Sequence, residues 1–125
     1  MIDIPTSYGE LIDKITILEI KVEHGIESAS HELDCLNKIY SIEYTKMGFS
    51  PIIERMRNVL KAINQQCWDI EDGKRLCEKE QRFDDTFIDL SRSVYYFNDL
   101  RAEVKRKINK LSDSAIVEYK SYGEY

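Results

Sequence analysis

The chain of 125 residues is poor in the residues that interrupt helices, with only two prolines and five glycines. A β-sandwich or barrel needs frequent turns and is usually richer in both residues, so this scarcity argues against an all-β fold. Charged residues make up 33% of the chain, which suits long helices with a solvated face. The composition therefore favours an all-α fold, and the length fits a single helical domain over residues 1–125.

Paired cysteines, long apolar runs and clustered positive charge are also missing. The three cysteines, Cys35, Cys67 and Cys77, are an odd number without Cys-x-x-Cys spacing, so we expect reduced thiols in a cytoplasmic protein. The first residues lack the features of a signal peptide, and no apolar run is long enough to span a bilayer. Net charge is -5, with Lys and Arg interspersed among Asp and Glu. Neither a membrane nor a nucleic acid is therefore an expected partner.

The spacing of apolar residues predicts four helices. In the first, Ser7 and Glu10 form a capping box, and apolar residues then advance by threes and fours as far as Gly25. Further isoleucines lie off this stripe, so the helix is apolar on several sides. We expect it to occupy either a central position in the bundle or a contact between subunits.

A second helix is expected from Ser28 or Ser30 to about Met47, where the following glycine ends it. The pair Ser50-Pro51 supplies the N-cap and first residue of the third helix. Residues 114–125 are expected to form a short helix or a docked tail.

The third and fourth helices have the most regular pattern. Apolar positions step by three and four without a slip through residues 53–77 and again through residues 87–111. A short link near Gln81 to Asp84 separates them, which predicts a long antiparallel αα-hairpin packed with the shorter N-terminal helix pair. Gly73 is the point at which the third helix could break, since glycine inside a helix costs about 1 kcal/mol relative to alanine.

Each seam of this hairpin contains one charged residue, and on the fourth helix it is Arg101. Pairing the two arms about their turn places Arg101 level with Asn64 and Trp68, with Glu71 about one turn away. We predict a partly buried ion pair between Arg101 and Glu71, with Trp68 stacked on the guanidinium. Such a pair would specify the packing of the bundle or a subunit contact.

A second interpretation makes Arg101 part of a binding site. Asn98 and Lys105 lie one turn on either side of it, and together these groups could clamp a carboxylate or phosphate. The candidate ligand-binding residues are Arg101, Asn98, Lys105, Trp68, Glu71 and Asn64.

Other patterns of chemistry are weak. Carboxylates recur at helical spacing, but the chain lacks the paired-Glu helix and Glu-x-x-Asp helix of the all-helical nucleotide pyrophosphohydrolases. His31 and Cys35 could supply half of a zinc site, with no second pair to complete it. The first helix faintly resembles that of the helical chorismate mutases, without the arginine that their motif requires. We therefore expect no metal site and no cofactor, and no catalytic residue can be assigned.

Four segments carry a more extensive likeness: residues 8–21 (YGELIDKITILEIK), 62–72 (AINQQCWDIED), 92–109 (RSVYYFNDLRAEVKRKIN) and 116–122 (IVEYKSY). In these segments the chain resembles a family of small proteins of unknown function that occurs in bacteria and in phages of aquatic bacteria. The resemblance follows nearly the whole chain in order. It implies one kind of helical domain and no activity.

Two functions follow from these patterns. The first is a non-enzymatic interaction or assembly module, forming a homodimer through the first or fourth helix. The alternative is a helical-bundle enzyme or small-anion-binding protein with its site around Arg101. A pocket converging on Arg101, Trp68 and Glu71 would favour the alternative, whereas a continuous packed seam would favour the assembly module.

Overall fold

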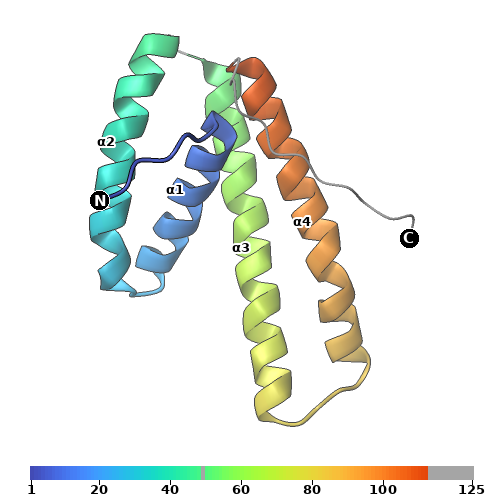
Figure 1. Cartoon of the computed structure of the whole chain (residues 1–125). Helices are drawn as coiled ribbons and strands as arrows, with labels where there is room; N and C mark the ends of the chain where they lie inside the picture. Colours follow the sequence, from blue (N-terminus) through green and yellow to red (C-terminus); the bar gives the residue numbers. More distant parts are fainter. Residues whose placement is uncertain (49, 113–125) are drawn as a thin grey trace.

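A computed structural model describes residues 1–48 and 50–112 of the chain. Its elements in chain order are α1 (Tyr8–Glu23), the 3-10 turn η1 (Glu27–Ala29), α2 (Ser30–Met47), α3 (Pro51–Lys79) and α4 (Asp85–Leu111). The described residues contain no strand, and the all-α prediction is confirmed (Figure 1). The tail expected over residues 114–125 lies outside the described part of the chain.

α1, α3 and α4 each begin directly after a residue whose side chain caps the helix, whereas α2 begins at Ser30, after Ala29, without a side-chain cap. Ser7 and Ser50 each accept a hydrogen bond from the amide three residues later, at 3.1 and 3.3 Å, and Asp84 caps the first turn of α4. These bonds satisfy amides that a helix leaves without an internal partner. Only the serine half of the predicted capping box forms, because the Glu10 carboxylate pairs with Lys105 of α4 instead.

The hairpin of α3 and α4 is long and unbroken. α3 continues through Gly73 to Lys79, so the possible break at this glycine does not occur. A Cβ atom at Gly73 would lie only 3.0 Å from Leu90 Cδ1. The missing side chain thus lets the two arms approach closely, which compensates for the low helix propensity of glycine.

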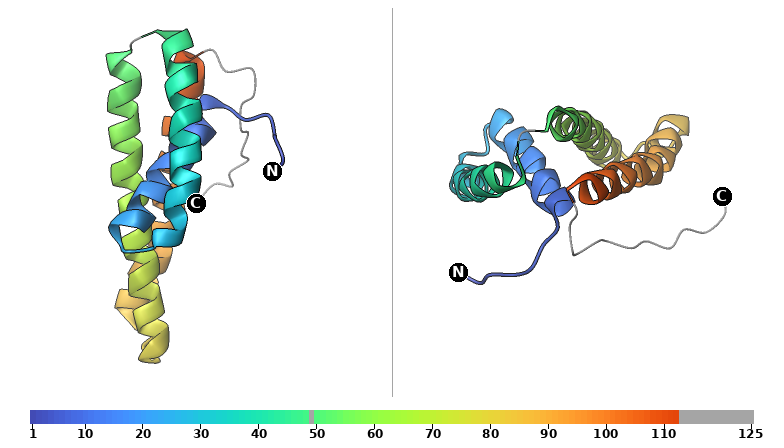
Figure 2. Two further views of the ribbon diagram at one scale, coloured as in Figure 1. Left: turned by 90° about the vertical axis from the view of Figure 1, so that its left-hand side faces the viewer. Right: turned by 90° about the horizontal axis from the view of Figure 1, so that it is seen from above.

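α1 is the central helix of the bundle. It packs against α2, α3 and α4, and Figure 2 shows it between α2 and the hairpin. Ile12, Ile15 and Ile20 of α1 are each at most 1% exposed. The central position, one of the two expectations for this helix, is confirmed, and its several apolar faces are covered within one chain. The main core consists of Leu11, Ile12, Ile15, Tyr40, Ile53, Leu60, Ile63, Val104 and Ile108.

The hairpin extends beyond the other two helices. α1 and α2 lie against the half that contains the end of α4, and the half near the turn between α3 and α4 is only two helices thick (Figure 1). The ring of His24, just after α1, lies against Trp68 of α3. The fold therefore has a boundary near Trp68, where the helix in the groove of the hairpin ends.

Candidate functional site: a buried ion pair and its adjoining pocket

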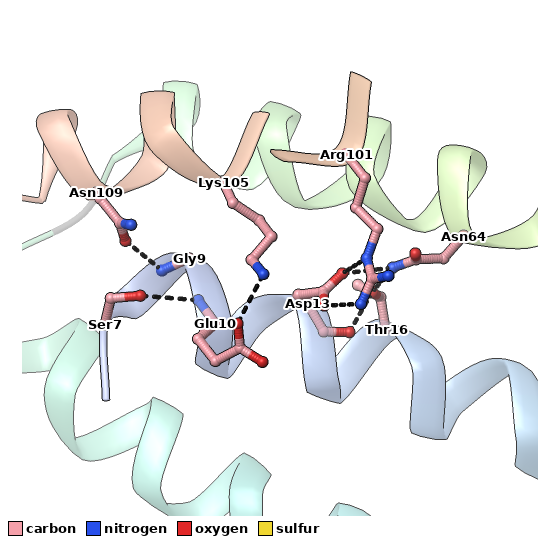
Figure 3. A network of polar contacts seen from close by, with 9 residues as sticks. All are labelled: Ser7, Gly9, Glu10, Asp13, Thr16, Asn64, Arg101, Lys105 and Asn109. Atoms are coloured by element: carbon pink, nitrogen blue, oxygen red, sulfur yellow. Dashed lines mark hydrogen bonds and ion pairs between the residues drawn. The ribbon is translucent and has the colours of Figure 1, made fainter. Parts of the chain in front are cut away.

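A buried carboxylate lies where α1 meets the hairpin. The side chain of Asp13 is 1% exposed. Arg101 Nε donates to Asp13 Oδ1 at 2.8 Å, and Nη2 donates to Oδ2 (Figure 3). Asn64 Nδ2 donates to both Asp13 Oδ1 and Thr16 Oγ1, each at 2.9 Å. Three helices thus meet in one buried polar network.

The guanidinium of Arg101 keeps its charge in this network. Burial of an ion is costly unless an opposite charge and hydrogen bonds compensate for the lost hydration. The bidentate ion pair between Arg101 and Asp13 supplies both. Hydrogen bonding to Asp13 raises the pKa of Arg101 above its usual value, although burial alone would lower it. The guanidinium is therefore held charged and in one orientation.

The predicted ion pair between Arg101 and Glu71 is wrong. Arg101 pairs with Asp13 of α1, and the Glu71 carboxylate lies 3.7 Å from Lys74 Nζ of its own helix. The prediction that Arg101 and Asn64 lie at the same height along the hairpin is correct, since both side chains contact the Asp13 carboxylate. Pairing the two arms of a hairpin cannot reveal a third helix that lies in the groove along them (Figure 2).

α1 is also attached to α4 at two points further along. Lys105 Nζ lies 2.7 Å from Glu10 Oε2, and the Gly9 amide donates to Asn109 Oδ1 at 2.7 Å. Arg101, Lys105 and Asn109 are four residues apart, so they form one stripe on α4 (Figure 3). This stripe fixes α1 antiparallel to α4 and positions Asp13 against Arg101.

A pocket of about 280 Å³ opens beside the buried ion pair. It is lined by Ile17, Ile20, Asn64, Cys67, Trp68, Glu71, Asp72, Arg75 and Arg101. These residues come from α1, α3 and α4, so the pocket lies where α1 ends over the hairpin. Its walls combine isoleucine and indole surface with charged and amide groups.

Four of the six predicted site residues, Arg101, Asn64, Trp68 and Glu71, line this pocket together. The other two do not. Lys105 is buried and paired with Glu10, and Asn98 is half-buried on α4 outside the lining. Sequence reasoning missed the contributions of Asp13, Ile17 and Ile20. These residues are spaced by four and three, so they share one face of the first helix. A carboxylate on this otherwise apolar face was the feature of the sequence that could have identified Asp13 as a buried site residue.

The indole of Trp68 has an unusual environment. Its Nε1 is buried and has no hydrogen-bond partner within the described residues. The ring packs on His24 with 4.4 Å between centroids, and His24 Nδ1 lies 2.8 Å from the Ile20 carbonyl oxygen. A buried donor without a partner costs about 1–3 kcal/mol. Such a group calls for a compensating role, and here it belongs to a residue that lines a pocket.

Cys67 lies among the charges of the pocket. Burial raises the pKa of its thiol, and the charge of Arg101 opposes this shift while Asp13 and Glu71 reinforce it. The thiol is consequently protonated near neutral pH and is a weak nucleophile. All three cysteines of the chain are free.

Within residues 1–48 and 50–112, no group of three or more His, Cys, Asp or Glu side chains could hold a metal ion. Among the same residues, no helix combines the length and apolarity needed to cross a membrane.

Together the fold and the site define the class of this protein. It is a small helical bundle whose central helix packs on a long αα-hairpin, and the end of that helix forms one wall of a pocket with both polar and apolar lining residues. The chain belongs to a family of unknown function, DUF6165, whose model matches residues 2–124. No curated protein and no solved structure matches it. The expected membership of a family of unknown function is thereby confirmed. Three of the four segments that carried the resemblance meet at the Asp13–Arg101 network.

Proposed function

We propose that this protein binds a compact organic molecule in the pocket beside Arg101. The observation that carries the proposal is the convergence of Arg101, Trp68 and Glu71 on one pocket, together with the buried Trp68 Nε1, which has no hydrogen-bond partner within residues 1–48 and 50–112. Ligand sites are typically concave and mostly apolar, with a few fixed polar groups, and have volumes of about 300–1,000 Å³. A pocket of about 280 Å³ lies just below the lower end of that range, which suits a small molecule of metabolite size.

The anchored guanidinium supports binding of a hydrogen-bond acceptor. Asp13 engages Nε and Nη2 of Arg101, and in the described part of the chain no group accepts from Nη1. Because Arg101 is already oriented by Asp13, little side-chain entropy is lost when a ligand accepts from the remaining N–H groups.

A small anion such as phosphate or a carboxylate is one candidate ligand. The charge of Arg101 favours it, whereas the neighbouring Asp13 carboxylate already neutralises that charge. We propose binding rather than catalysis, because burial raises the pKa of the thiol in the pocket and so removes its most obvious nucleophile.

Filling the pocket tests this proposal. Ile17 is half-buried and lines the pocket, so Ile17→Phe should occupy the space and abolish ligand-induced thermal stabilisation in a screen of small metabolites. Ile39→Phe is the matched control, since Ile39 is exposed on α2 outside the pocket. Stabilisation of Ile17→Phe equal to that of the wild type would contradict the proposal.

The thiols provide a second readout on the same protein. A bound ligand should slow alkylation of Cys67, which lines the pocket, and leave Cys35 on α2 unchanged. Peptide mapping by mass spectrometry measures both rates at once. Equal slowing at the two cysteines would indicate a general change in stability and not occupation of the pocket.

Assembly as a homodimer is a second candidate function. The exposed half of the hairpin has large apolar side chains that α1 and α2 do not cover, and it is the surface we propose for contact with a second copy. These side chains, each 45–50% exposed, are Leu76, Phe83, Ile88 and Tyr95. Two hairpins packed together would form a four-helix arrangement, and this contact would include the fourth helix.

Light scattering at tens of micromolar protein tests the dimer. We expect a dimer for the wild type and a monomer for Ile88→Glu, because a charge at the centre of an apolar contact is costly to bury. Ile42→Glu on α2, where Ile42 is also exposed, should leave the dimer intact. A wild-type monomer under these conditions would refute the assembly function.

We also propose a cytoplasmic location. The three free thiols are compatible with the reducing conditions of that compartment. Recovery of the protein with three reduced cysteines from the cytosolic fraction supports this location, and recovery from a membrane or extracellular fraction contradicts it.

A further inference from the structure

We infer that the ligand of this pocket is a zwitterion whose carboxylate and ammonium groups are separated by a short apolar chain. The carboxylate would accept from Arg101, and the ammonium group would lie near Glu71 and Asp72. This inference rests on the proposed function and narrows it to one chemical class, that of the ω-amino acids.

The charges around the pocket cancel. Arg101 is matched by Asp13, and Glu71 lies 3.7 Å from Lys74. The remaining charged residues of the lining, Asp72 and Arg75, have opposite signs. A ligand with net charge would add an uncompensated ion to a partly enclosed space, which is unfavourable. A ligand with balanced charges avoids this penalty.

The opposite charges are separated along the pocket. Asn64 marks the end nearest Arg101, because both residues contact Asp13. Glu71 and Asp72 lie two turns later on α3, roughly 10–12 Å along the helix axis at 1.5 Å per residue. A carboxylate and an ammonium group attached to the same carbon cannot extend along such a wall. A chain of several methylene groups between them can.

The middle of the pocket is apolar. Ile17, Ile20 and Trp68 line it between the two charged ends, and the indole face also attracts a cation. Cys67 also lines this wall, between Asn64 and Glu71 along α3. Methylene groups against this wall would be removed from water, while the carboxylate accepts from Arg101 and the ammonium group donates to the Glu71 and Asp72 carboxylates.

Trp68 is the only tryptophan of the chain, so its fluorescence reports on the pocket directly. The full chain is titrated with 6-aminohexanoate, hexanoate and hexylamine, which share one apolar chain and differ in charge. We expect 6-aminohexanoate to bind at least about tenfold more tightly than either singly charged probe, because only the zwitterion satisfies both ends. Hexanoate or hexylamine binding as tightly as the zwitterion would overturn the inference.

Variants of Glu71 and Asp72 test whether these residues bind the ammonium group of the ligand. The double variant Glu71→Gln/Asp72→Asn should lose the preference for 6-aminohexanoate over hexanoate, and both positions are exposed on α3, so the fold tolerates the change. Asp69→Asn, on the same helix outside the pocket lining, is the matched control and should keep the preference. An unchanged preference in the double variant would contradict the assignment.

A broader screen separates this inference from the proposed function. Small metabolites of every charge class are tested by Trp68 fluorescence and protection of Cys67. If only singly charged or uncharged molecules bind, the proposed function stands and the zwitterion is wrong. If none binds, the proposed function fails and the inference fails with it.

Discussion

At the scale of single residues, the structure of the bundle depends on how one buried carboxylate is satisfied. Asp13 accepts hydrogen bonds from Arg101 and Asn64 and is almost completely removed from water. A pair of this kind contributes little net stability compared with well-packed apolar residues, but the loss of one partner is severe. We infer that its role is specificity, because Asp13 joins α1 to both Arg101 of α4 and Asn64 of α3 in this placement.

The first prediction concerns this pair. Arg101→Met should lower the free energy of unfolding by about 3–5 kcal/mol, because it leaves the Asp13 carboxylate buried without its counter-ion. The double variant Asp13→Leu/Arg101→Met should recover most of the loss, since it removes both charges. Urea unfolding of the wild type, both single variants and the double variant measures the coupling.

Lys107→Met is the control for this series. Lys107 lies 3.7 Å from Glu103 in an exposed pair, and exposed pairs are worth about 0–1 kcal/mol. If Arg101→Met costs no more than Lys107→Met, the Asp13–Arg101 pair does not stabilise the position of α1.

Tyr40 makes the stability of the protein depend on pH in the alkaline range. Burial, followed by the hydrogen bond of the Tyr40 hydroxyl to Glu54, raises the pKa of Tyr40 from 10.0 to about 12. The folded state therefore favours the neutral phenol. This contribution to stability is complete below pH 10 and is lost as the pH rises toward 12.

Thermal unfolding between these two pH values is the measurement. The melting temperature of the wild type should fall more steeply with pH than that of Tyr40→Phe, which has no phenol to ionise. Tyr96 is exposed, so Tyr96→Phe should follow the wild type. Parallel curves for the wild type and Tyr40→Phe would show that Tyr40 ionises alike in both states.

At the scale of the helices, the close approach of α1 to α4 depends on Gly9. A Cβ atom at this position would lie 2.6 Å from the backbone carbonyl oxygen of Lys105 and 2.8 Å from Asn109 Oδ1. Backbone atoms of α4 cannot move aside individually, so α1 itself would have to shift. The first turn of α1 is thus held against α4 by the absence of a side chain as well as by the hydrogen bond to Asn109.

Alanine substitutions at Gly9 and Gly73 distinguish the effect of helix–helix contact from the effect of helix propensity. Gly9→Ala should destabilise the protein by about 1–3 kcal/mol through steric overlap with α4. Gly73→Ala should be near neutral, because the Leu90 methyl group that it meets at 3.0 Å can move and the helix gains about 1 kcal/mol of propensity. Equal effects of the two variants in urea unfolding would contradict this account.

The sequence predicted the helices better than it predicted their contacts. Ser7, Ser50 and Asp84 mark helix starts because capping is local. The level of Arg101 beside Asn64 followed from counting along one hairpin. Asp13 was missed because its partners lie on two helices distant in the chain, and apolar periodicity does not state which helix enters the groove between the arms.

At the scale of the whole molecule, the pocket follows from unequal helix lengths. α3 has 29 residues and α4 has 27, whereas α1 has only 16. α1 therefore covers part of the hairpin and ends near Trp68, where its last residues and the two arms enclose the pocket. The same shortfall leaves the far half of the hairpin open to a second copy, so one architectural feature underlies both proposed functions.

A crystal structure grown with 6-aminohexanoate is the decisive test of whether the pocket beside the Asp13–Arg101 pair holds a small molecule. We expect electron density for the probe against Trp68, with its carboxylate within hydrogen-bond distance of Arg101 Nη1 and its ammonium group near Glu71 and Asp72. Density elsewhere on the protein, or a pocket that holds only water at a probe concentration that saturates the change in Trp68 fluorescence, would contradict it.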